Sequence, residues 1–194
     1  MGRPRLEGKE GYDAAVRRFW YEAYACERGH ELPGADHVRR EVHDPMAEQG
    51  NLIVARGEGG TVRGTVLTTY ANQGDLGFYV DYFGLEPGNP HQSMTTRLVV
   101  APSERRTRLS FELALTAYNQ ALIDGIQQDF VDCQHRHLAY FTRLGYRRLG
   151  PDKVHPLYGP SALLVLDPWD RAHLEAVGSP LVRVLDRMAV RAAS

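Results

Sequence analysis

Cysteine and lysine are scarce in this sequence of 194 residues, and long hydrophobic runs are missing from it. Only Cys26 and Cys133 are cysteine, so no disulfide framework is predicted and a reducing cytoplasm is the expected compartment. Only Lys9 and Lys153 are lysine, so 21 of the 23 basic residues are arginine. Apolar runs such as Ala162–Leu166 are far shorter than the ~20 residues that cross a bilayer, so no membrane span is expected.

The charges nearly cancel. The 23 basic and 24 acidic residues give a net charge of −1 at pH 7, so the field of the whole chain is not expected to recruit nucleic acid. Residues 1–11 carry charges but no apolar core of a secretory signal. Hydrophobic residues make up 43% of the sequence, which is enough for a core and excludes a wholly disordered chain.

Five segments carry helical signals, either apolar residues every three or four positions or residues typical of helix ends. These signals predict helices over residues 12–28, Ala35–Glu41, Arg108–Asp124, Leu138–Leu144 and Pro180–Ala193. Pro102 closes a preceding strand, so the longest helix is expected to begin near Thr107–Leu109. Ser179 is expected to cap the last helix.

Six short apolar or β-branched runs predict strands. They are Asn51–Arg56, Thr61–Tyr70, Gly77–Phe83, Ser93–Val100, Asp129–Cys133 and Ser161–Leu166. Gly57–Gly60 is typical of a hairpin turn, and Gly64 suggests a bulge. Helices and strands mix along the chain, and we see no internal repeat or linker. The sequence therefore predicts a flexible segment over residues 1–11 and a single α/β domain over residues 12–194.

Two segments resemble the core of the GNAT acyltransferase fold, namely Thr96–Tyr118 and Phe130–Tyr146. In that family a strand ends in an Arg/Gln-x-x-Gly-x-Gly/Ala loop, whose amides hold the pyrophosphate of a pantetheine arm at a helix start. Here the loop is Arg105–Ser110, in which Arg108 replaces the first glycine. The resemblance implies a single-domain mixed sheet flanked by helices. It also implies that the thioester arm is bound by Val100, Arg105, Arg106, Arg108 and Ser110.

The N-terminal half is similar to bacterial N-acyl amino acid synthases and, more distantly, to acyl-homoserine lactone synthases. The similar segments are Arg18–Gly29, Glu41–Asp44 and Gly64–Leu67. Leu67 stands where the lactone synthases carry arginine, which argues against S-adenosylmethionine as the acceptor. The resemblance implies transfer of a medium or long acyl group to an amino acid or related amine. The donor is expected to be acyl carrier protein or CoA, acting as a cosubstrate, and no tightly bound cofactor or metal is implied.

Three residues are candidates for catalysis. Glu27 fits the family pattern on the first helix, and Asp81 lies among aromatic residues where partial burial would raise its pKa. Tyr140 is the candidate acid for the departing thiolate, provided that the register shifts by one, because Phe141 occupies the usual tyrosine position. Other possible bases are Glu22 and His91.

Several alternatives stay open. Cys133, His135 and His137 could hold zinc or form a Cys-His pair, although a buried cysteine with two polar loop histidines is favoured. The aromatic residues Phe78–Phe83, with Trp20, predict an apolar pocket for a lipid-like chain. The alternative functions are an acetyl-CoA-dependent acetyltransferase of small amines and a non-catalytic module that binds acyl carriers or thioesters.

Overall fold

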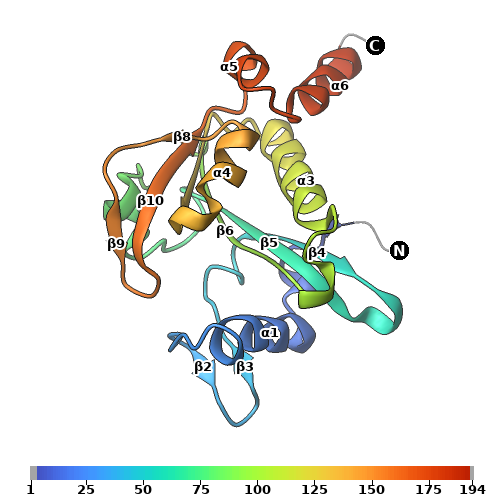
Figure 1. The fold of residues 1–194 in the computed structure, drawn as a ribbon, viewed down its shortest axis with the longest axis vertical. Coiled ribbons are helices and arrows are strands. Elements are labelled where there is room, and N and C mark those ends of the chain that lie inside the picture. Colours follow the sequence, from blue (N-terminus) through green and yellow to red (C-terminus); the bar gives the residue numbers. More distant parts are fainter. Residues whose placement is uncertain (1–3, 193–194) are drawn as a thin grey trace. The chain divides into compact units, whose positions relative to one another are not determined.

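A computed structural model describes residues 4–192 of the chain (Figure 1), and their contacts group into two compact units. The first unit comprises the chain up to residue 69 together with residues 73–76 and 95–116. The second comprises residues 70–72, 77–94 and the chain from 117 onward. Strand β6 (Gln92–Val100) and helix α3 (Leu109–Ile123) contribute residues to both units. None of the described helices has the length and apolar character of a membrane span.

In the first unit, three strands and the end of β6 form an antiparallel array with the order β1-β4-β5-β6. The strands β1, β4 and β5 span Arg5–Leu6, Asn51–Arg56 and Val62–Tyr70. The interior of β4 is completely apolar and buried, as its unbroken apolar run predicts for a strand covered on both faces. Helix α1 (Ala14–Trp20) begins where the Asp13 carboxylate accepts the Val16 amide, and continues as a π-helical stretch, Tyr21–Cys26. A hairpin of β2 (Ala35–Asp36) and β3 (Glu41–Val42) follows.

The second unit is built on β7 and β10. Strand β7 (Gln128–Cys133) runs parallel to the start of β6 and antiparallel to β10 (Gly159–Leu166). Strand β10 also pairs with β8 (Arg147–Arg148) and β9 (Lys153–His155). The hydrogen-bonded order along the chain's main sheet is thus β1-β4-β5-β6-β7-β10-β8, which confirms the predicted mixed α/β class.

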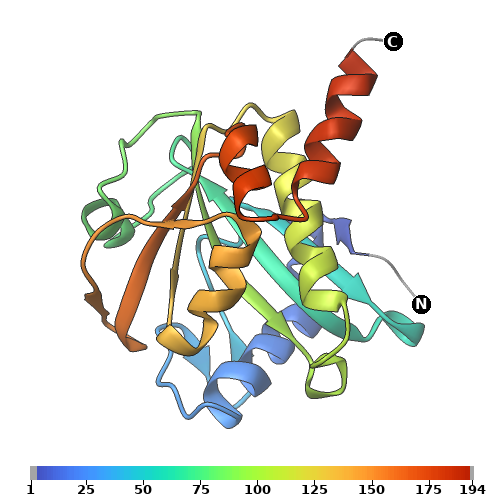
Figure 2. The same ribbon diagram turned by 45° about the horizontal axis from the view of Figure 1, so that its top comes forward.

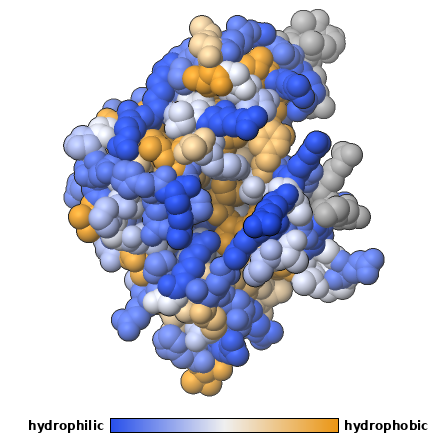
Figure 3. Space-filling view, viewed as in Figure 1, coloured by the Kyte–Doolittle hydropathy of each residue, from blue (hydrophilic) through white to orange (hydrophobic). Residues whose placement is uncertain are grey.

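The second unit also contains helices. The helices α2, α4, α5 and α6 span Tyr79–Phe83, His135–Leu144, Arg171–Ala176 and Val182–Ala192. Helix α4 lies against β7 and β10 (Figure 2) and buries Phe141 and Leu144. On the face drawn in Figure 3, hydrophilic side chains cover most of the surface and apolar ones show between them. The sequence did not predict β8, β9 or α5.

The predicted bulge in the hairpin of the first unit is confirmed. The pairing of β4 with β5 shifts between Ala55, which opposes Gly64, and Arg56, which opposes Val62. Gly64 also permits a close approach, because a Cβ atom there would lie 3.1 Å from a Val100 methyl group and from a backbone oxygen of β6. The glycine is therefore a packing requirement as well as part of the bulge.

Two predicted elements are wrong. The helix expected over Ala35–Glu41 is the β2–β3 hairpin, because the Asp36 carboxylate accepts the amides of Val38 and Arg39 and so forms a turn. The strand expected over Gly77–Phe83 is helix α2, whose aromatic residues are spaced for one helical face. It ends at Gly84, which has a φ of 73°.

The chain ends also differ from expectation. Residues 1–11 were expected to fray, whereas β1 pairs with β4 and the Glu7 carboxylate lies 2.8 Å from Arg56. Residues 1–3 of that segment lie outside the described residues. Helix α6 begins at Val182 rather than Pro180, and the predicted end at Ala193 is also outside the described part.

Candidate functional site

The connection from β6 to α3 has the predicted form of strand, loop and helix. A 3-10 turn, Pro102–Glu104, follows β6, and α3 begins at Leu109, which confirms the expected start. The Thr107 hydroxyl donates to the Glu104 carbonyl at 2.7 Å and accepts the Leu109 amide at 3.1 Å. The buried Glu104 carboxylate lies 2.5 Å from Arg63 of β5. The loop before α3 is therefore fixed at both ends, directly before the positive end of the helix dipole.

The three arginines of this loop are not equivalent. Arg105 donates through Nη2 to both carboxylate oxygens of Glu27 at 2.5 Å, so two predicted site residues meet. This contact holds the pKa of Glu27 below its usual range, which makes Glu27 a poorer base than an isolated carboxylate. Arg106 and Arg108 are exposed, and neither has an ion pair within residues 4–192. These two guanidinium groups are the ones available to a phosphate.

The remaining two residues predicted for this loop lie at its ends. Val100 is the last residue of β6 and Ser110 is the second residue of α3, and both are half-buried. The parallel pairing of β7 with β6 runs from Gln92 to Met94. The stretch of β6 that leads to Val100 therefore lies beyond the residues that pair with β7.

A buried ion pair in the first unit was not found from the sequence. Arg97 has a φ of 53°, an unusual value for a strand residue other than glycine. Its Nη2 and Nε atoms donate to the Asp44 carboxylate at 2.7 and 3.0 Å. The guanidinium also lies 5.2 Å from the ring centre of Trp20 and 4.9 Å from that of Tyr24. Opposite charge and two aromatic faces together offset the cost of burying this cation.

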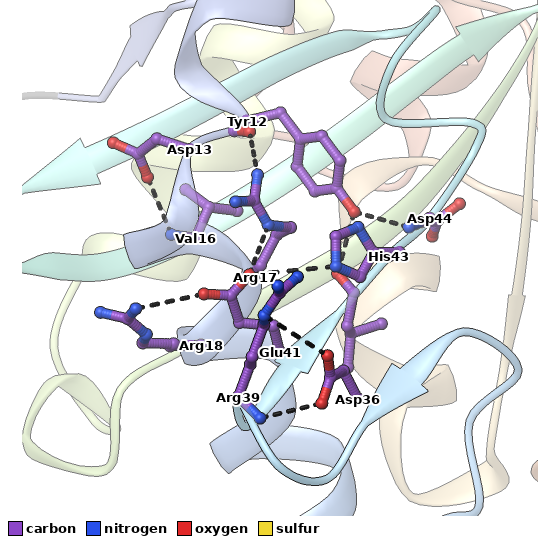
Figure 4. A network of polar contacts seen from close by, with 11 residues as sticks. Tyr12, Asp13, Val16, Arg17, Arg18, Asp36, Arg39, Glu41, His43 and Asp44 are labelled. Carbon is purple, nitrogen blue, oxygen red and sulfur yellow. Dashed lines mark hydrogen bonds and ion pairs between the residues drawn. The ribbon is translucent and has the colours of Figure 1, made fainter.

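A polar network joins Asp44 to the first helix and the hairpin (Figure 4). The Tyr12 hydroxyl donates to the Val42 carbonyl at 2.9 Å and accepts the Asp44 amide at 2.5 Å. Burial raises the pKa of Tyr12 to about 12, so this phenol stays protonated near neutral pH. Glu41 is buried and accepts Arg17 Nε at 2.9 Å. The network therefore holds Asp44 in place through backbone as well as side-chain contacts.

Trp20 was expected to line an apolar pocket for an acyl chain, but it is part of the packed interior. Its side chain is fully buried, and Nε1 donates to the Thr65 hydroxyl at 2.9 Å. That hydroxyl donates in turn to the Arg97 carbonyl at 3.0 Å. The tryptophan thus supports the backbone of β6 at the residue with positive φ.

In the second unit, the predicted catalytic residues lie on two helices. Asp81 is exposed on α2, so its expected partial burial is wrong. Tyr140 is half-buried on α4, with its ring centre 5.2 Å from that of Phe141. Of the aromatic residues around α2, Phe78 remains 43% exposed, while the buried members are Tyr79, Tyr82 and Phe83.

The zinc alternative is not supported. Among the described residues, no group of three His, Cys, Asp or Glu residues could hold a metal ion. Cys133 is buried at the end of β7, and burial raises the pKa of its thiol to about 11, which disfavours a nucleophilic thiolate. His135 lies in the first turn of α4 with Nε2 2.8 Å from the Asp152 carboxylate.

Comparisons with known proteins agree on the fold. The acyl-homoserine lactone synthase BjaI, described as CoA-dependent and solved with SAM and isopentyl-CoA, is 16% identical, with 93% of this chain and 90% of that chain covered and a TM-score of 0.69. FeeM, an N-acyl amino acid synthase from uncultured soil microbes, is 16% identical, with coverage of 94% and 99% and a TM-score of 0.65. A putative acetyltransferase of the GNAT family from Desulfovibrio desulfuricans is 12% identical, with coverage of 87% and 99% and a TM-score of 0.60.

These likenesses confirm the predicted GNAT-like fold. No curated protein sequence matches the chain. A family profile described as "N-acyl amino acid synthase FeeM" matches residues 15–167, which is most of the chain. The chain therefore belongs to the FeeM family of N-acyl amino acid synthases, and it is an acyltransferase that acts on an amine.

Proposed function

We propose that this acyltransferase moves a medium or long acyl chain from a phosphopantetheine thioester to the amino group of an amino acid or a related amine. The observation that carries the proposal is the loop before α3, where Arg106 and Arg108 are exposed beside the helix amides. Acyl carrier protein and CoA present the same phosphopantetheine arm. The CoA-dependent synthase BjaI and the N-acyl amino acid synthase FeeM, both similar in fold, support a thioester donor and an amine acceptor.

The three loop arginines have different roles in donor binding. Arg106 and Arg108 bind phosphate oxygens of the arm, and the amides at the start of α3 add their partial positive charge. Arg105 acts with Glu27 as a positioning pair, because its guanidinium is already engaged. Val100 and Ser110 flank the arm through the strand end and the first helical turn. An acidic acyl carrier protein would meet the same cationic loop.

The chemical step needs an acid and a base. Tyr140, a half-buried residue of α4, is the proposed acid that protonates the leaving thiolate. Asp81, a candidate base, is exposed on α2.

A donor panel tests the proposal. Purified protein is incubated with decanoyl-acyl carrier protein, decanoyl-CoA or acetyl-CoA together with a pool of amino acids and small amines, and products are read by mass spectrometry. Each methylene buried from water contributes about 0.8 kcal/mol, so N-decanoyl products are expected to form much faster than N-acetyl products. Equal or faster acetylation would instead support the small-amine acetyltransferase. Donor binding without any amide product would contradict transfer.

A further inference from the structure

The ion pair between Glu27 and Arg105 joins the first helical segment to the loop proposed to bind the donor, and both residues belong to the first unit. Glu27 follows the π-helical stretch, and Arg105 follows the 3-10 turn after β6. Their side chains remain 37% and 45% exposed. A solvated ion pair of this kind contributes little to stability, so its main effect is on the charge of the loop.

The backbone of this loop is held without help from the pair. The Glu104 carbonyl accepts the Thr107 amide at 3.1 Å. Between them, Arg105 has φ −63° and ψ 137° and Arg106 has φ 73°, the values of a type II turn. Arg106 thus occupies a position that favours glycine, a strained placement that is typical of functional loops. Neutralising Glu27 is therefore expected to leave the turn in place and to release only the Arg105 guanidinium.

The pair determines how many cations of the loop face a ligand. Both Glu27 oxygens accept Arg105 Nη2 at 2.5 Å, and this contact holds the pKa of Glu27 below its usual range, so the carboxylate is charged at neutral pH. Arg28, the next residue, lies with its guanidinium 4.8 Å from the centre of a tyrosine ring. Arg106 and Arg108 are exposed and form no ion pair within the described chain. The loop therefore presents two uncompensated guanidinium groups, and the third is held by a carboxylate.

The two possible donors differ in the charge that they bring to this loop. In acyl carrier protein the arm is joined to the protein through one phosphodiester, which carries a single negative charge. In CoA the same arm continues into a diphosphate and a 3′-phosphate, which together carry about −4 at pH 7. The energy of a ligand near a fixed charge scales with the charge of the ligand. The Glu27 carboxylate therefore opposes CoA more strongly than it opposes the carrier-bound arm.

We propose that Glu27 is a specificity-determining residue that makes the carrier-bound arm, rather than CoA, the preferred donor. It holds the Arg105 guanidinium on its own carboxylate, which leaves Arg106 and Arg108 for the single phosphodiester of the arm and disfavours the more highly charged ligand. The inference rests on the proposed function, since it assumes that this loop binds the phosphate of a thioester donor. It deepens that function by naming the donor and the residue responsible for the preference.

The test measures kcat and KM of Glu27→Gln and wild type with three donors: decanoyl-acyl carrier protein, decanoyl-CoA and decanoyl-pantetheine, which has no phosphate. Glutamine keeps the shape of the side chain but loses its charge, so Arg105 becomes available to phosphate oxygens. At 50 mM NaCl the variant should lower the KM for decanoyl-CoA by about ten-fold and that for the carrier donor by less than about three-fold. The KM for decanoyl-pantetheine should not change. The gain with decanoyl-CoA should shrink at 500 mM NaCl, where the charges are screened.

Two controls separate the release of Arg105 from a general change of charge. Glu175→Gln removes an exposed carboxylate that lies 2.8 Å from Arg171 on α5, and it should leave all three KM values unchanged. In a protein that also carries Arg105→Ala, the change of Glu27→Gln should lower the KM for decanoyl-CoA by no more than about two-fold, because the guanidinium that it releases is absent. A ten-fold gain in that background would contradict the role given to Arg105.

The outcomes distinguish this inference from the proposed function. An unchanged KM for decanoyl-CoA in Glu27→Gln, or an equal fall in KM for CoA and carrier donors, would overturn the role of Glu27 and leave acyl transfer intact. A wild-type protein with a lower KM for decanoyl-CoA than for the carrier donor would also overturn the preference alone. A wild-type protein that forms no amide from any of the three donors would overturn both.

Discussion

The buried Arg97–Asp44 ion pair predicts a large and specific loss of stability when one partner is neutralised. In Asp44→Asn the amide keeps the shape of the side chain but leaves the Arg97 guanidinium without its counter-ion. The side chains are only 13% and 6% exposed, so the cation cannot recover its hydration in place. Breaking such a pair costs about 3–5 kcal/mol, a large share of the roughly 5–15 kcal/mol that stabilises a typical protein.

The assay is urea unfolding followed by far-ultraviolet circular dichroism. Asp44→Asn should lower the midpoint without changing the slope of the transition. A control variant, Glu27→Gln, removes the partner of Arg105 in an exposed pair whose side chains are 45% and 37% accessible. That change should cost no more than about 1 kcal/mol.

A compensating variant sharpens the test. Replacing both partners by apolar residues, as in Asp44→Leu with Arg97→Met, removes the uncompensated charge. The double variant should therefore be more stable than Asp44→Asn alone. If Asp44→Asn is no more destabilising than Glu27→Gln, the reasoning about the buried pair is wrong.

Three further predictions concern the loop, Asp132 and the segment Cys133–His137. The double change of Arg106→Ala and Arg108→Ala should raise the donor KM by about ten-fold or more and weaken its dependence on salt, measured by initial rates at 50 and 500 mM NaCl; an unchanged KM would contradict phosphate binding by the loop. Burial raises the pKa of Asp132 from 3.8 to about 6, because it disfavours the charged carboxylate. The charged carboxylate therefore destabilises the fold above pH 6. This destabilisation disappears as the pH falls towards 4 and the carboxylate becomes protonated. Asp132→Asn should therefore raise the free energy of unfolding at pH 7.5 by up to about 3 kcal/mol and change it little at pH 4, and a loss of stability at pH 7.5 would refute this sign. Cys133→Ala and His137→Ala should leave turnover within a few-fold and release no metal by elemental analysis, whereas zinc lost from Cys133→Ala would require a different mechanism.

Local patterns predicted the elements whose signal lies within a few residues. The apolar run Asn51–Arg56 is strand β4 with the same bounds. Pro102, which follows β6, correctly predicted that α3 begins several residues later. The loop arginines could be found for the same reason, since a strand, a polar turn and a helix follow one another directly. The strand prediction for Gly77–Phe83 failed because a short aromatic run fits either periodicity.

Contacts between distant residues could not be predicted in this way. Asp44 and Arg97 are 53 residues apart, and the sequence around either residue does not indicate that the other is its partner. The pairing of Glu27 with Arg105 spans 78 residues, so the sequence suggested both residues but not that one engages the other.

The most direct test of the central claim is the stoichiometry of acyl transfer. Free thiol released from a decanoyl thioester and N-decanoyl product are measured in the same reaction, with and without an amino acid acceptor. We expect one amide for each thiol released and almost no thiol release without the acceptor. Thiol release that does not depend on the acceptor, or that occurs without any amide, would show a hydrolase and contradict the assignment of N-acyl transfer.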